Sequence, residues 1–173
     1  MTRAAIALSV ALLASPGCDP VHSDAVAALG PEAPDVHTGP THRPGQPCLV
    51  CHDGGFGDPP RFTLAGTVYE TPDAKVGVNG AMVTLVETDG YTTQWTTNEA
   101  GNFYVTPDQY QPTFPLQATI QAPGGPAVHM QTLIGGNSTL APNGACSSCH
   151  FDPVGPNSPG HLSLALDDGG TPP

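Results

Sequence analysis

The chain has very little positive charge. Only 4 of its 173 residues are Lys or Arg, whereas 15 are Asp or Glu, and the formal net charge is -11. Proteins that bind nucleic acid present a basic surface to the phosphate backbone. The composition therefore excludes nucleic acid as a partner, and the acidic charge favours basic partners.

Long hydrophobic runs are also scarce. The apolar run 4–14 is too short to cross a bilayer as a mature helix. It follows Arg3 and precedes the small residues 15–17, which is the pattern of an export signal. The letters LLASPGC, which end at Cys18, resemble a bacterial lipobox, and this resemblance implies that residues 1–17 are removed and Cys18 is lipidated. The alternative is an ordinary cleaved signal. We expect an extracytoplasmic protein, in the periplasm or on the outer surface of a bacterium, anchored to a membrane through Cys18.

Cysteine is rare, and its five copies divide into two pairs and one remainder. The pairs lie in CLVCH, residues 48–52, and CSSCH, residues 146–150. The remainder is Cys18, the residue that a lipid anchor would consume, so no thiol is left unexplained. The 21 Gly and 21 Pro residues favour loops, turns and short strands, with little helix beyond the signal.

The sequence pattern changes several times along the chain. Pro and Gly dominate before residue 61 and after residue 134, whereas apolar and polar residues alternate between these points. The predicted segments are a signal (1–17), a flexible tether (18–40), a first irregular segment (41–60), a β-sandwich (61–134), a second irregular segment with a closing strand (135–166) and a disordered tail (167–173).

Six short runs between residues 61 and 133 have the period of two that is typical of strands. Phe62, Leu64 and Val68 alternate with smaller residues, which indicates a half-buried strand. Gly90 suits a hairpin turn and Gly101 suits a position with positive φ. The predicted strands lie within 61–70, 81–87, 91–97, 103–105, 116–121 and 128–133. We therefore expect a mainly β fold, a small antiparallel β-sandwich with irregular segments on both sides.

Three parts of this region resemble a known family. The stretches LAGTVYE, NGAMVTLVETDG and TTNEAGNFYV are similar to the carboxypeptidase regulatory-like (transthyretin-like, prealbumin-like) β-sandwich family over about residues 61–133. The resemblance implies a scaffold. It implies no peptidase activity, because such modules carry no catalytic residues of their own.

The Cys-x-x-Cys-His pattern, present twice, is the attachment motif of c-type haem. With five Cys and seven His in 173 residues, one copy is expected roughly 0.006 times by chance. In this motif the two thiols add to the vinyl groups of the porphyrin and the histidine binds the iron. The sequence therefore predicts two covalent haems, attached through Cys48, Cys51 and His52, and through Cys146, Cys149 and His150.

The second protein ligand of each iron cannot be identified from spacing. His42, six residues before Cys48, is the candidate for the first haem, and His161, eleven after His150, is the candidate for the second. His129 and Met130, which face opposite ways on a strand, are further candidates. His37 is a weaker one, His22 is expected to be a tether residue, and Met82 a core residue.

The number of protein ligands on each haem iron decides which activity is predicted. An iron with two protein ligands has no open position for a substrate, which favours electron transfer with other redox proteins or cytochromes over catalysis. An open position would favour a haem sensor or a peroxidase-like enzyme. The two haems could lie at one end of the sandwich or at opposite ends, and haems of neighbouring protomers could also contact one another.

Two interpretations without haem stay open. The four paired thiols could form a zinc site with four cysteine ligands, although this would give His52 and His150 no role. They could also form two disulfides, although a two-residue spacer makes a tight and reducible loop. In either case the chain would be an extracytoplasmic binding or structural module built on the β-sandwich.

Overall fold

The computed structural model describes residues 20–32, 38–54, 60–135 and 144–165. Its elements are α1 (Pro20–Ala28), α2 (Leu49–His52), β1 (Leu64–Thr67), β2 (Met82–Glu87), β3 (Thr92–Thr96), β4 (Asn102–Val105), β5 (Leu116–Gln121), β6 (Ala127–His129) and the 3₁₀ helix η1 (Cys146–Ser148). The signal with Cys18, the side chain of His22, the residue His37 and the predicted tail lie outside the described residues.

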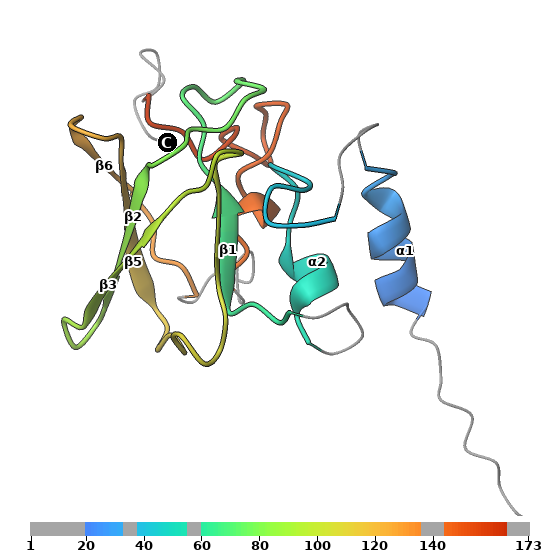
Figure 1. The fold of residues 1–173 in the computed structure, drawn as a ribbon, viewed down its shortest axis with the longest axis horizontal. Coiled ribbons are helices and arrows are strands. Elements are labelled where there is room, and N and C mark those ends of the chain that lie inside the picture. Colours follow the sequence, from blue (N-terminus) through green and yellow to red (C-terminus); the bar gives the residue numbers. More distant parts are fainter. Residues whose placement is uncertain (1–19, 33–37, 55–59, 136–143, 166–173) are drawn as a thin grey trace, which may run out of the picture.

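The strands form two antiparallel sheets. One sheet has four strands in the order β3-β2-β5-β6, and the other pairs β1 with β4. Figure 1 shows the pair beside the four-stranded sheet, with α2 and α1 beyond β1. The predicted mainly β fold and small β-sandwich are confirmed, and each described strand overlaps one of the six predicted runs.

Alternating side chains build the core between the sheets. Val83 and Leu85 of β2, together with Leu116 and Ile120 of β5, are buried and meet Val105 from β4. The turns follow the predicted chemistry, because Gly90 between β2 and β3 and Gly101 before β4 both have positive φ, 88° and 80°. Period-two patterning was therefore a sound guide to this part of the chain.

β1 differs from the prediction, because it is buried on both faces rather than on one. All four of its residues are buried, and Leu64 faces the main core while Ala65 belongs to a second apolar cluster. Leu49, Phe62 and Ala145 complete that cluster. The irregular segments on either side of the sandwich cover the outer face of β1.

Two further expectations were wrong. The segment predicted to be a flexible tether contains helix α1, which contacts α2. The predicted closing strand, residues 161–166, contributes a single bridge between Ser163 and Tyr69 in its described part. Its Leu162 and Leu164 nevertheless pack against the core. No helix in the described part of the chain is long and apolar enough to cross a membrane.

Candidate functional site

The two Cys-x-x-Cys-His motifs fold in the same way. In the first motif, the N–H groups of Cys51 and His52 donate to the carbonyl of Cys48, at 3.2 and 3.0 Å. In the second motif, the N–H groups of Cys149 and His150 donate to the carbonyl of Cys146, again at 3.2 and 3.0 Å. Each motif is thus a single tight helical turn, which keeps both thiols and the imidazole close to one point of the backbone.

The structure brings the two motifs together, although 93 residues lie between them in the sequence. The N–H of Phe62, just before β1, donates to the carbonyl of His52 at 2.8 Å. Ala65 of β1 forms a bridge with Ala145, the residue before the second motif. Cys48 packs against the cluster that contains Ala65 and Ala145. Both motifs therefore lie at one side of the sandwich, against β1. This placement corresponds to the first of the two arrangements considered from the sequence.

Gly66 allows the close contact between β1 and the second motif. A Cβ atom at this position would lie 2.8 Å from Cβ of Cys146, 3.3 Å from its Sγ and 3.0 Å from the ring of Phe103. Contacts this short are not tolerated, so any other residue would push Cys146 away. The sequence signal was a glycine inside a strand, which often marks a close approach of another segment.

The four described paired cysteines are not bridged. Burial raises the pKa of Cys48 to about 11 and that of Cys146 to about 12, and in each case a neighbouring thiol adds to the increase. These two groups are therefore neutral thiols at pH 7. Among the described residues, no three His, Cys, Asp or Glu side chains are grouped closely enough to hold a metal ion.

The histidine of the first motif is held among aromatic rings. His52 is buried, and its Nδ1 lies 2.8 Å from the carbonyl oxygen of Pro60. A carbonyl only accepts, so Nδ1 carries the proton and the lone pair of the ring is on Nε2. The ring of Phe62 lies 4.6 Å from that of His52, and Tyr104 stacks on Phe62 at 4.9 Å. Protonation on Nδ1 is the form of histidine that binds a metal through Nε2.

His42, the sequence candidate for the second ligand of the first haem, lies beside His52. Their ring centroids are 5.9 Å apart and their planes are 24° from parallel, in a stacked arrangement. However, the N–H of Gly39 donates to Nδ1 of His42 at 3.1 Å, which places the ring proton on Nε2. Coordination through Nε2 would require this hydrogen bond to break.

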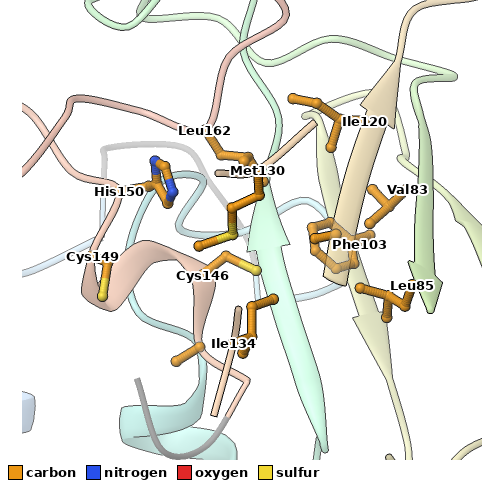
Figure 2. A pocket seen from close by; sticks show the side chains of 12 residues that line it. Val83, Leu85, Phe103, Ile120, Met130, Ile134, Cys146, Cys149, His150 and Leu162 are labelled. Carbon is orange, nitrogen blue, oxygen red and sulfur yellow. The ribbon is translucent and has the colours of Figure 1, made fainter. Parts of the chain in front are cut away.

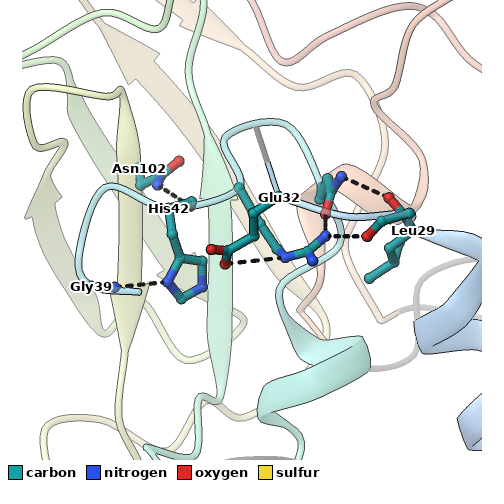
Figure 3. Close-up of polar contacts among 8 residues, drawn as sticks. Leu29, Glu32, Gly39, His42 and Asn102 are labelled. Carbon is teal, nitrogen blue, oxygen red and sulfur yellow. Dashed lines mark hydrogen bonds and ion pairs between the residues drawn. The ribbon is translucent and has the colours of Figure 1, made fainter. Parts of the chain in front are cut away.

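Polar contacts fix the loop that carries His42 (Figure 3). Asn102 of β4 donates from Nδ2 to the carbonyl of His42 at 3.1 Å. Arg43 binds Gln46 at 2.8 Å and forms an ion pair with Glu32 at 3.3 Å. These contacts connect the predicted first irregular segment to the sandwich and to the end of α1, so the loop has a defined course without a core of its own.

His161, the sequence candidate for the second haem, lies near segments of both motifs, because it acts electrostatically on Asp152, two residues after His150, and its ring also approaches residues before the first motif. It stacks on Tyr69 with centroids 4.0 Å apart, and its Nδ1 lies 2.9 Å from the carbonyl oxygen of Ala74. Its Nε2 points toward Gly45, three residues before Cys48, because a Cβ on that glycine would lie 3.7 Å away. Like His52, it carries its ring proton on Nδ1.

The second motif borders an apolar cavity inside the sandwich (Figure 2). Cys146, Cys149 and His150 form one wall, and Met130 approaches from the end of β6. Burial lowers the pKa of His150, which a contact with the Gly160 backbone partly offsets. Its Nδ1 is buried and has no hydrogen-bond partner among the described residues. In His52 the same nitrogen lies within hydrogen-bond distance of the Pro60 carbonyl, so the two motifs differ in what orients the imidazole.

His129 lies on the other side of its strand. It is exposed, and its Nδ1 forms a 3.0 Å hydrogen bond with the hydroxyl of Thr119. Met130, the next residue, packs against the core, so the two face opposite ways as predicted. Met82, expected in the core, is 38% exposed. The sequence analysis did not identify Tyr69, Phe62 or Gly66 as parts of the site, since only the fold brings them to the motifs.

The donor sets fit haem, but the space is small. Each motif presents two unbridged cysteines and an imidazole on one backbone turn, as covalent haem requires. The cavity beside His150 has a volume of about 30 Å³, which admits water-sized molecules but not a porphyrin. A porphyrin would therefore have to displace part of the irregular segment 144–165, and binding would be coupled to the packing of that segment.

No protein-family model, curated protein or solved structure matches this chain. The resemblance of residues 61–133 to the carboxypeptidase regulatory-like family remains a prediction. The function must be argued from the two motifs and their surroundings.

Proposed function

We propose that this protein is an exported, membrane-anchored dihaem c-type cytochrome that acts in electron transfer. The observation that supports this most directly is the matched pair of turns at residues 48–52 and 146–150, which share one hydrogen-bond pattern and lie side by side against β1. Two attachment turns with the same hydrogen-bond pattern beside one strand would hold two redox centres near each other.

The side chains have distinct tasks in this proposal. Each thiol adds across a vinyl double bond: the sulfur bonds to one carbon, the thiol hydrogen goes to the other, and no oxidant is needed. Cys48, Cys51, Cys146 and Cys149 form these bonds. His52 and His150 bind iron, and the Pro60 carbonyl orients His52 for this role. Bound haem supplies a one-electron iron couple.

The N-terminal export signal and Cys18 support the proposed location outside the cytoplasm. Covalent attachment of c-type haem takes place outside the cytoplasm, and the N-terminal pattern 1–17 is that of an export signal. Lipidation of Cys18 would anchor the chain at the membrane surface. The partners would be other redox proteins or cytochromes, and the charge of -11 favours those with a basic docking surface.

Haem counting tests the proposal. The full-length chain is produced in a host with c-type haem maturation, and its haem content is measured by the pyridine haemochrome spectrum and intact mass. We expect two haems per chain, and one in each double variant, Cys48→Ala with Cys51→Ala or Cys146→Ala with Cys149→Ala. Ser148→Ala is the matched control, because Ser148 is exposed and lies between the cysteines of the second motif.

A colourless protein at the mass of the bare chain would contradict the proposal. Such a protein would then be examined for bound zinc and for disulfides, the two alternatives that use the same cysteines. Membrane attachment is tested separately, by fractionation of cells that produce the parent or Cys18→Ser. We expect the parent in the membrane fraction and the variant released.

A further inference from the structure

The cavity beside the second motif contains few atoms that could bind a metal. Apart from the residues of the motif itself, its walls are hydrocarbon side chains, among them Val83, Leu85, Phe103, Ile120, Ile134 and Leu162. None of these side chains has an atom that could bind a metal. The exception is Met130, whose thioether sulfur is a ligand for haem iron in other cytochromes c.

The backbone fixes the direction of Met130. Its N–H donates to the carbonyl of Ala118 on β5 at 3.0 Å, immediately after β6 ends at His129. Because side chains alternate along extended backbone, His129 faces outward and Met130 inward. Figure 2 shows Met130, Cys146 and His150 among the side chains that line the cavity.

A second feature is that His150 lines the same cavity. Its ring forms part of the wall together with Cys146 and Cys149, so the imidazole of the second motif and the thioether of Met130 border one space.

We infer that Met130 is the second protein ligand, opposite His150, of the iron held by the second motif. This inference rests on the proposed function. The candidate beside the first motif, His42, is an imidazole. A methionine opposite histidine raises the reduction potential relative to two histidines. The two sites are then unequal, and electrons pass from the first motif to the second.

The test compares two methionines in the full-length chain with both haems attached. Met130→Leu removes the thioether and nearly conserves side-chain volume, so the core should tolerate it. Met82→Leu is the matched control, because Met82 lies on β2 with its side chain exposed. The readouts are the ferric methionine-to-iron charge-transfer band at the red end of the visible spectrum and a redox titration of both haems.

We expect the parent and Met82→Leu to show the band and two separate redox waves. Met130→Leu should lose the band, and only the wave at higher potential should move to a lower value. A band and potentials unchanged in Met130→Leu, or a parent with two haems and no band, would overturn the inference and leave the proposed function intact. A chain without haem by mass would overturn the proposed function, and the inference with it.

Discussion

The two motifs share a backbone and differ in almost everything around it. Both form a single turn with hydrogen bonds of 3.2 and 3.0 Å to the first cysteine. The first is surrounded by rings, with Phe62 and His42 beside His52. The second faces mostly aliphatic side chains, together with the ring of Phe103 and the sulfur of Met130. The five-residue motif thus sets its own local conformation, while residues distant in sequence set the properties of the site.

The difference follows from where each motif meets β1. The first precedes the strand, so it contacts the outer cluster and the aromatic residues that cover it. The second lies across the strand at Gly66, where the missing side chain brings Cys146 close to Phe103 and the core. The two copies of the motif therefore lie in unequal environments, and under the proposed function they would hold the same group at unequal potentials.

The largest expected effect on this comparison comes from variants in which one of the two motifs can no longer attach haem. With Cys48→Ala and Cys51→Ala the chain keeps the haem of the second motif, and with Cys146→Ala and Cys149→Ala it keeps the haem of the first. We expect the haem of the second motif to have the higher potential, by roughly 0.1 V or more within the span of about 0.8 V that axial ligands cover. Spectroelectrochemical titration of the two single-haem proteins measures this difference.

Equal potentials would show that the surroundings do not distinguish the sites. A higher potential at the first motif would reverse the proposed direction of electron transfer. The parent protein is the control, because its two waves should be close to those of the single-haem proteins.

The next effect tests the contact at Gly66. Gly66→Ala places a methyl group 2.8 Å from Cβ of Cys146, and relieving such overpacking costs typically about 1–3 kcal/mol of stability. We expect haem attachment to fall at the second motif and to be retained at the first. Peptide mass mapping, which separates the two attachment sites, measures the loss.

Gly155→Ala is the matched control, because a Cβ at Gly155 meets no atom within 4 Å. It should leave both attachment sites fully loaded. Equal loss at both motifs in Gly66→Ala would show that the substitution acts on the whole fold rather than on the contact with Cys146.

A smaller effect should follow from the ring beside His52. Phe62→Leu removes the aromatic contact at 4.6 Å and leaves space in the outer cluster. We expect a destabilisation of about 1–3 kcal/mol, less than the full removal of a buried Phe, and a changed spectrum of the first haem alone. Phe151→Leu, just after the second motif, is the control. A change in both haem spectra would contradict a local role for Phe62.

Much of the fold could be predicted because its signals are local. Alternation identified β2 and β5, and Gly90 and Gly101 marked turns that need positive φ. The double burial of β1 could not be predicted, since its outer face is covered by segments from both ends of the chain. The helix α1 was missed because its Pro-rich and Gly-rich neighbourhood favours irregular structure.

The candidate site likewise has a part that could be predicted from local sequence and a part that could not. The sequence placed His42 beside His52, because the two are close along the chain. It assigned His161 to the second motif by the same argument, yet the ring lies against Tyr69 and Gly45. Segment 161–165 runs along the end of β1 through bonds such as that from Tyr69 N–H to the Leu162 carbonyl, at 2.8 Å. This pairing is non-local, and no pattern within the segment indicates it.

The smallest effect on the comparison should come from a charge inside the sandwich, away from both motifs. The hydroxyl of Tyr110 donates to the Glu87 carboxylate at 2.5 Å, and the N–H of Thr113 donates to it at 3.0 Å, which together lower the pKa of Glu87. Because the pKa of Glu87 is lowered in the folded state, its ionised carboxylate stabilises the fold at pH values above about 4.3, the usual pKa of Glu. This contribution disappears as the pH falls through the folded-state pKa. Tyr110→Phe should therefore destabilise the protein most at pH 7, and the difference from the parent should shrink below about pH 4, as followed by urea unfolding at each pH. The spectra of both haems should change to the same extent, because the substitution acts through the scaffold that they share. A stability difference that does not depend on pH would show that Tyr110 stabilises the fold by packing rather than through the carboxylate of Glu87.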